Sequence, residues 1–299
     1  MNAPSPDSTE GCPLGHSSDE RRRTLTELTG GQPWTEFPPG ATPYVAYAEM
    51  DALLSLQRPR TAAPTEPAFI IVSQIKELLF KLLHTELEST RDELAADRID
   101  QALWTLRRAE RAQRLLLSCW EVLSALSPTE FAQFRDVLGQ ASGFQSYSYR
   151  RLEFLLGNKN PAMIAPHRNT EHFDEVLGQL RQPSLYDEVL GVLARNGLEI
   201  PAEVLDRDVA APYAPHEQVE AAWRRVYRES DKYRELFLLG EALTDVADQF
   251  ARWRYTHLVT VQRMLGAKPG TGGTGGVAWL AGISERRFFP ELWTVRSAL

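Results

Sequence analysis

Two charged or titratable side chains lie on apolar helix faces, where each could do chemistry. In WRYTHLVTVQRMLG (253–266), His257 lies one turn from Trp253 and Val261. A histidine on such a face is most often a hydrogen-bonded core residue, but a neutral imidazole in an apolar cavity also ligates haem iron. Because the chain has no C-x-x-C-H motif, any haem would be bound non-covalently. The spacing leaves both interpretations open.

Arg135 shares its predicted helix face with Phe131 and Leu138. The usual fate of an arginine is a surface salt bridge. A guanidinium held against apolar neighbours can instead form a fork that binds the carboxylate of a substrate.

The stretch GTGGTG (270–275) matches G-x-G-x-x-G, but it follows a predicted helix. The dinucleotide-binding motif follows a strand and opens a helix, so the match is weak. The stretch is either a flexible linker or a mobile loop that closes over a ligand, with a hydroxyl from Thr271 or Thr274. The sequence has no G-x-S-x-G, no H-E-x-x-H and no Cys–His cluster.

The stretch FIIVSQIKELLF (69–80) reads as a buried helix that Ser73 and Gln74 interrupt. On a helical wheel, Ser73 lies between Phe69 and Phe80. Its hydroxyl either bonds back to the carbonyl of Phe69 or serves a ligand.

Helical signals dominate from Tyr44 onward and must position these residues. In SPTEFAQFRDVLG (127–139), Ser127 is the predicted N-cap, Glu130 completes an S-x-x-E capping box, and Gly139 ends the helix. AKPGTGGTGG (267–276) cannot be helix, and no period-2 alternation or internal repeat is visible, so the fold is predicted to be all-α. The apolar periodicity predicts further helices at 44–58, 69–92, 98–126, 148–156, 184–196, 216–240 and 241–266.

The composition of the 299 residues predicts a mobile tail at 1–42, rich in Pro, Gly, Ser and Thr, and one domain at 43–299. A net charge of −7 without basic blocks argues against nucleic acid, and no apolar run approaches the ~18 residues of a membrane span. Cys12 and Cys119 do not suggest a disulfide framework, and no signal-peptide pattern is present. We therefore expect a cytoplasmic protein.

Five stretches together resemble the tryptophan 2,3-dioxygenase superfamily over about residues 44–296, and they occur in the family's order. They are FIIVSQIKELLFKLLHTEL, FRDVLGQASGFQSYSYRRLEFLLGNKNP, PSLYDEVL, WRYTHLVTVQRMLGAKPGTGGTGG and FFPELWTVR. The resemblance implies a helical bundle that encloses one b-type haem per subunit, a homotetramer, and an oxygenase that acts with O2 on the indole ring of tryptophan or a derivative.

The resemblance also implies roles for single residues. His257 matches the axial ligand of the haem iron, and Arg135 matches the residue that holds the amino acid's carboxylate. Tyr44 and Tyr47 match tyrosines that complete the site of a neighbouring subunit. The positions that line the substrate pocket match Phe69, Leu138, Ser142 and Thr271.

Three positions depart from the family's pattern. Ser73 stands where the family has a distal histidine that binds the indole N–H; its hydroxyl can still accept that hydrogen bond, worth about 1 kcal/mol net. It is therefore the candidate catalytic residue. Phe131 replaces a tyrosine that helps to bind the carboxylate. Ala48 replaces a bulkier aliphatic residue, and this leaves room for a β-substituted tryptophan.

Three functions follow from these departures. The first is an ordinary dioxygenase that opens the indole ring of L-tryptophan to N-formylkynurenine. The second is a divergent oxygenase that inserts one oxygen atom at indole C2 and gives a 2-oxindole. The third is a haem-binding protein without catalysis, against which the intact Arg135, Ser142 and Thr271 argue. The altered distal position favours the second function as the sequence-based expectation.

Overall fold

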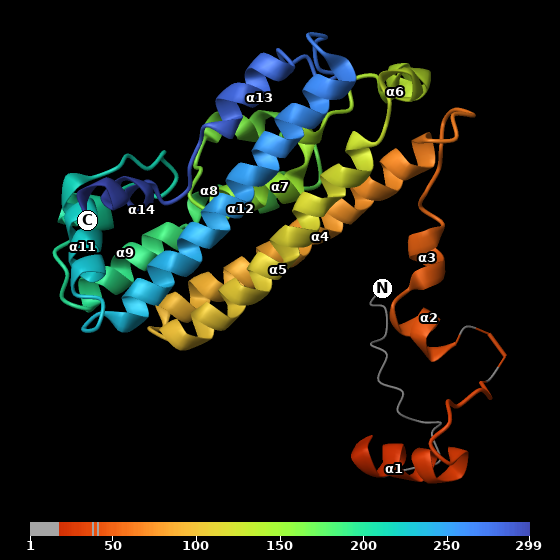
Figure 1. The fold of residues 1–299 in the computed structure, drawn as a ribbon, viewed down its shortest axis with the longest axis horizontal. Helices are drawn as coiled ribbons and strands as arrows, with labels where there is room; N and C mark the ends of the chain where they lie inside the picture. Colours follow the sequence, from red (N-terminus) through yellow and green to blue (C-terminus); the bar gives the residue numbers. More distant parts are fainter. Residues whose placement is uncertain (1–17, 38, 41) are drawn as a thin grey trace, which may run out of the picture. The chain divides into compact units, whose positions relative to one another are not determined.

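Three long helices form the framework of the computed structural model, which describes residues 18–37, 39–40 and 42–299 (Figure 1). They are α4 (Glu66–Ala95), α5 (Ile99–Ser124) and α12 (Arg234–Leu265). Helix α5 packs against both α4 and α12. The described residues contain α-helices and 3-10 helices and no strand, which confirms the all-α prediction.

Shorter helices cover this framework. Helix α7 packs on α4 and α8, α9 packs on α4, and α13 packs on α12, while α11 and α14 pack on each other. None of the helices in the described part of the chain has both the length and the apolarity to cross a membrane. The shorter elements of the framework's unit are α6 (Pro128–Arg135), η1 (Asp136–Leu138), η2 (Gly143–Gln145), α7 (Tyr147–Leu155), η3 (Pro161–His167), α8 (Phe173–Arg181), α9 (Leu185–Arg195), α10 (Ala202–Leu205), α11 (Glu217–Arg228), α13 (Val277–Ser284), α14 (Pro290–Thr294) and η4 (Val295–Ala298).

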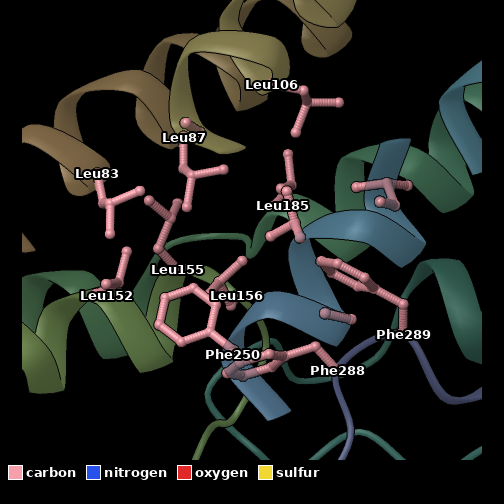
Figure 2. Close-up of a cluster of buried hydrophobic side chains, with 14 of the residues drawn as sticks. Leu83, Leu87, Leu106, Leu152, Leu155, Leu156, Leu185, Phe250, Phe288 and Phe289 are labelled. Atoms are coloured by element: carbon pink, nitrogen blue, oxygen red, sulfur yellow. The ribbon is translucent and has the colours of Figure 1, made fainter. Parts of the chain in front are cut away.

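The core lies where leucine and phenylalanine side chains from several helices meet (Figure 2). Leu83 and Leu87 of α4, Leu152 of α7 and Leu185 of α9 are all 0% exposed. Each side chain of this kind stabilises the fold by roughly 1.5–3 kcal/mol when it is fully buried. The core therefore fixes α4, the helix that carries Phe69 and Ser73.

A buried charged network ties α7 to α12. The Glu153 carboxylate accepts hydrogen bonds from Tyr149 Oη and Arg254 Nη2, both at 2.9 Å, and from Arg150 Nη1. Glu153, Arg150 and Arg254 are each less than 5% exposed. Removing one partner of a buried ion pair leaves an uncompensated charge, so the two helices are held in one register. Arg254 lies three residues before His257, and the network therefore fixes the part of α12 that carries this histidine.

The predicted capping box before α6 is confirmed. Ser127 Oγ accepts from Glu130 N at 3.3 Å, and Ser127 N donates to Glu130 Oε2 at 2.8 Å. Gly139 follows the short helix η1 with a φ of +55°, a conformation that favours glycine.

The predicted boundary between helices 216–240 and 241–266 is wrong. Helix α11 ends at Arg228, and α12 runs without a break from Arg234 to Leu265, through Gly240. This position inside the helix favours glycine, because a Cβ atom there would lie 3.0 Å from the Trp223 ring and 3.3 Å from Tyr227 Oη. A glycine that reads as a helix end in the sequence is thus a position of close packing.

The segment 44–58 forms two short helices rather than one, α2 (Pro43–Tyr47) and α3 (Met50–Leu54), because Glu49 between them adopts a φ of +49°. These helices and α1 (Ser18–Thr29) belong to one compact unit, which ends at Leu56; a second unit begins at Gln57. The composition of the predicted tail did not reveal α1. The boundary at residues 42 and 43 and the mobility of the tail stay predictions. Residues 1–17, with Cys12, lie outside the described residues.

Candidate functional site

His257 of α12 lies against two indole rings. Its imidazole stacks on Trp120 of α5, with ring centroids 4.4 Å apart and planes 14° apart, and the Trp253 ring is 6.0 Å away. Burial, assisted by the Lys76 ammonium group, lowers the pKa of His257 to about 3, so the imidazole is neutral at pH 7. Neither ring nitrogen bonds to another described residue. His257 is partly exposed, so water can reach the imidazole, and a neutral imidazole with a nitrogen free of protein partners can also ligate iron.

The surroundings of His257 fit a haem. Trp120 Nε1 and Trp253 Nε1 are buried and have no acceptor among the described residues. Buried indole N–H groups usually find a partner, so these two donors are exceptions that call for an explanation. The Phe80 ring, 5.7 Å from Trp253, adds an apolar wall. An apolar macrocycle that also carries acceptors suits this combination of a neutral imidazole, aromatic walls and unpaired donors.

Arg135, at the end of α6, keeps donors available for a ligand. Its Nη2 donates to the Pro269 carbonyl at 2.8 Å, while its Nε is buried without an acceptor. Arg135 makes no ion pair with any residue that the structure describes. Arg135 therefore does not form the surface salt bridge that is most common for an arginine. The guanidinium can still donate hydrogen bonds to a carboxylate, in the bidentate geometry that arginine favours.

The glycine-rich loop after α12 packs on the segment after α6. Thr271 Oγ1 donates to the Ala141 carbonyl at 2.6 Å. A Cβ atom at Gly272 would lie 2.6 Å from Ser142 Cβ and 2.8 Å from Phe144 Cε1, so only glycine permits this approach. Residues 267–276 form no helix, as predicted. The structure thus brings Arg135, Ser142 and Thr271 together around one loop.

Aromatic contacts join the beginning of α4 to α6. The Phe69 ring lies 5.8 Å from Phe131 and 5.4 Å from Phe134, and the latter two meet edge to face at 5.2 Å. Leu138 packs against the same core. These side chains form an apolar wall directly beside Arg135. Such a wall suits the ring of an aromatic amino acid whose carboxylate the arginine holds.

Ser73 bonds back along its own helix, because its Oγ donates to the Phe69 carbonyl at 2.8 Å. A hydroxyl has one proton and two lone pairs, so this bond leaves Oγ able to accept from a ligand. The two sequence-based interpretations of Ser73 are therefore compatible. One turn further along α4, Lys76 lies over the Trp120 ring, with its Nζ 4.5 Å from the ring centroid. Ser73 and Lys76 therefore lie on neighbouring turns of α4, and Lys76 contacts the ring that stacks on His257.

Tyr44 and Tyr47 lie on α2 in the unit that ends at Leu56. They are 69% and 93% exposed. Their contribution to the site of a neighbouring subunit stays a prediction.

Lys76 and Trp120 are site residues that the sequence analysis missed. Lys76 follows Ser73 by three positions, so helical spacing alone was a signal that could have found it. Trp120 comes from another helix, and no local pattern relates it to His257. The stacking of these two rings depends on how α5 packs against α12.

A cavity of about 220 Å³ lies apart from these residues. Lys159, Arg207 and Tyr213 are among its lining residues, and none of the predicted site residues is. The Lys159 ammonium already donates to three backbone carbonyls, and Arg207 pairs with Asp187 at 2.6 Å. The hydrogen-bonding groups of Lys159 and Arg207 are thus already used within the fold.

Comparison with known proteins identifies relatives along most of the chain. A family model described as tryptophan 2,3-dioxygenase matches residues 30–180 and 224–299. The chain is 44% identical over 260 residues to a tryptophan 2,3-dioxygenase from Polaromonas sp., which covers 86% of this chain and 87% of the relative. It is 41% identical over 296 residues to a tryptophan 2,3-dioxygenase from Pseudomonas aeruginosa, which covers 96% of this chain and 100% of the relative.

The contact at Gly272 gives a test of the loop's position. Gly272→Ala should push the loop off Ser142, because overpacking of this kind costs about 1–3 kcal/mol and should raise loop opening by roughly tenfold or more. Hydrogen exchange of residues 267–276, followed by mass spectrometry, measures this. Gly275→Ala is the matched control, since a Cβ there meets nothing within 4 Å. Equal exchange in both variants would show that the loop does not rest on Ser142.

Proposed function

This chain belongs to the tryptophan 2,3-dioxygenase family, and we propose that it is a haem-dependent oxygenase that opens the indole ring of L-tryptophan to N-formylkynurenine with O2. The observation that carries the proposal is the neutral, unpaired His257 on an aromatic wall, with Arg135 free of any ion pair close to the apolar wall of Phe69 and Phe131. His257 and its aromatic wall suit a haem, whereas Arg135 and the apolar wall suit an aromatic amino acid.

His257 would hold the haem through its iron. When bound, the haem supplies the activation of O2 for oxygen transfer to the indole ring. Because burial keeps the His257 imidazole neutral, no proton has to leave it at pH 7 before the iron is bound. The stacking on Trp120 limits the rotation of the imidazole and so orients the bond that it offers.

The remaining residues would bind and orient tryptophan. The Arg135 guanidinium would hold the carboxylate, and the wall of Phe69, Phe131 and Leu138 would pack against the indole ring. Phe131 brings no hydroxyl, so Arg135 would bind the carboxylate with one donor fewer than in the family's usual pattern. Ser142 and Thr271 would close the site from the loop side, where Thr271 bonds to the Ala141 carbonyl and Gly272 lies against Ser142.

Ser73 would accept the indole N–H. Its own proton is held by the Phe69 carbonyl, so its oxygen is left as an acceptor. A serine hydroxyl does not titrate near pH 7, in contrast to a histidine, and it cannot exchange a proton with the substrate over that range. Ser73 would therefore orient the ring without acting as an acid or a base.

A second function, insertion of one oxygen atom to give a 2-oxindole, rests on Ser73 alone. The smaller, non-titrating group in the distal position favours a different ring placement. The relatives described above are named dioxygenases, which favours ring opening over the oxindole expectation. The substrate would be tryptophan or a β-substituted tryptophan in either case.

The proposed assembly is a homotetramer in which Tyr44 and Tyr47 complete a neighbour's site. Helix α4 carries an exposed apolar stripe, and exposed stripes of this size mark interaction surfaces. The stripe consists of Ile71, Ile75, Leu78 and Leu82, which are 41–51% exposed and spaced three or four residues apart. A cytoplasmic location stays a prediction.

Leu78→Glu should break the assembly, because it places a charge in the middle of the apolar stripe. Sedimentation velocity should show a tetramer for the wild type and smaller species for the variant. Gln218→Glu on the exposed face of α11 is the control and should stay tetrameric. A wild-type monomer would refute the proposed assembly.

His257→Ala should lose the haem or its native spectrum, because no other residue is proposed to ligate the iron. The Soret band and the haem-to-protein ratio of the purified variant measure this. A fully loaded His257→Ala protein with an unchanged spectrum would remove His257 from the site.

Arg135→Leu should weaken the binding of tryptophan by roughly tenfold to more than a hundredfold, since a hydrogen bond to a charged partner is worth about 1.5–3 kcal/mol. Binding of tryptamine, which lacks the carboxylate, should change little. Titration calorimetry with both ligands makes the comparison. Equal losses would mean that Arg135 acts only through its bond to the loop.

Products formed under ¹⁸O2 decide between one and two oxygen atoms. Mass spectrometry of the wild-type product should show N-formylkynurenine with two labelled atoms. Ser73→Ala should impair orientation of the substrate while haem binding survives, because the indole N–H loses its acceptor. A wild-type product with a single labelled atom would replace the dioxygenase by the oxindole-forming enzyme.

A further inference from the structure

Lys76 has a positive charge in the site and no partner for it. Its Nζ lies 4.5 Å from the centroid of the Trp120 ring, and Trp120 stacks on His257. No described residue forms a hydrogen bond or an ion pair with this ammonium group. Glu77, the neighbouring carboxylate, instead accepts from Ser146 Oγ at 3.0 Å. The contact with the indole face is therefore the one direct contact of this cation among the described residues, and Glu77 and Cys119 act on it only through their charges.

Holding this charge beside an indole ring costs free energy, and a bound anion would offset that cost. Burial lowers the pKa of Lys76 to about 8, which reflects the cost of holding the charge in this environment. A cation–π contact offsets only part of that cost, about 0.5–2 kcal/mol. A methionine would fill the same space without the charge, so the lysine is an unexpected choice for a merely apolar position.

We propose that Lys76 binds a propionate carboxylate of the haem beside His257 and thereby helps to seat the cofactor. This inference rests on the haem binding proposed above. It is supported by the contact of Lys76 with the Trp120 ring, which stacks on His257, and by the two unpaired indole donors, Trp120 Nε1 and Trp253 Nε1, beside that histidine.

The substrate's carboxylate is the other anion that could reach the site. Arg135 accounts for that carboxylate, and it lies at the loop end of α6, where it bonds to Pro269. Lys76 instead contacts the ring that stacks on the proposed iron ligand. The cofactor's carboxylate is therefore the partner that the contacts favour.

Lys76→Met tests the proposal with haem and with haem dimethyl ester, in which both propionates are masked. Haem-free protein is titrated with each compound, and the Soret band reports the dissociation constant. The variant should bind haem roughly tenfold to a hundredfold more weakly than the wild type, as expected for a lost charged partner. Both proteins should bind the dimethyl ester equally well.

Two further variants serve as controls. Lys76→Arg should restore most of the affinity for haem. Lys81→Met changes an exposed lysine of the same helix and should bind haem as the wild type does.

Each other outcome overturns the proposal. Equal affinity of wild type and Lys76→Met for haem would show that no propionate pairs with Lys76. An equal loss with the dimethyl ester, or a fall in the urea midpoint of haem-free Lys76→Met, would show that the side chain only fills space. A variant that loses its preference for tryptophan over tryptamine would assign Lys76 to the substrate. Failure of the wild type to bind haem at all would instead refute the proposed function.

Discussion

The geometry of the site depends on the hydrogen bonds and ion pairs of the buried Glu153 carboxylate. Two arginines, Arg150 from its own helix and Arg254 from α12, converge on it, and Tyr149 completes its shell. The Tyr149 ring in turn packs on Phe80 and Trp253, at 5.2 and 5.3 Å. A single carboxylate therefore fixes how α7, α12 and the aromatic wall beside His257 meet. Charges buried this deeply tolerate few alternative arrangements, so the network specifies one geometry as well as stabilising it.

Several polar groups around the site lack a protein partner, whereas the oxygens of the Glu153 carboxylate each accept at least one hydrogen bond. Arg135 Nε, the Lys76 ammonium group and the indole N–H groups of Trp120 and Trp253 have no acceptor among the described residues. A protein interior normally satisfies such groups. Unpartnered buried atoms also occur elsewhere in the described residues, but the two indole N–H groups lie beside His257 and Arg135 Nε lies beside the glycine-rich loop.

The sequence predicted the helical elements better than their ends, and it could not predict contacts between different helices. Helical periodicity and the capping box at Ser127 are local, and both are confirmed. The break at Gly240 was wrong because the packing of Trp223 from another helix, which no local pattern encodes, decides what that glycine does. The stacking of Trp120 on His257 escaped prediction for the same reason. The resemblance to the family suggested roles for Arg135 and Thr271, and the structure adds that Arg135 bonds to the loop that carries Thr271.

The hydrogen bond from Arg135 to the Pro269 carbonyl would couple the ordering of the glycine-rich loop to the binding of a carboxylate. The guanidinium bonds to the loop, and if it also holds a carboxylate as proposed, the order of the loop and the occupancy of the site would share one coupling free energy. Linkage is reciprocal: if a bound carboxylate strengthens the hold on the loop, an ordered loop raises the affinity for the carboxylate by the same factor. Substitutions in the glycine-rich loop, which lies outside the apolar wall, would then change which ligands this protein retains and for how long.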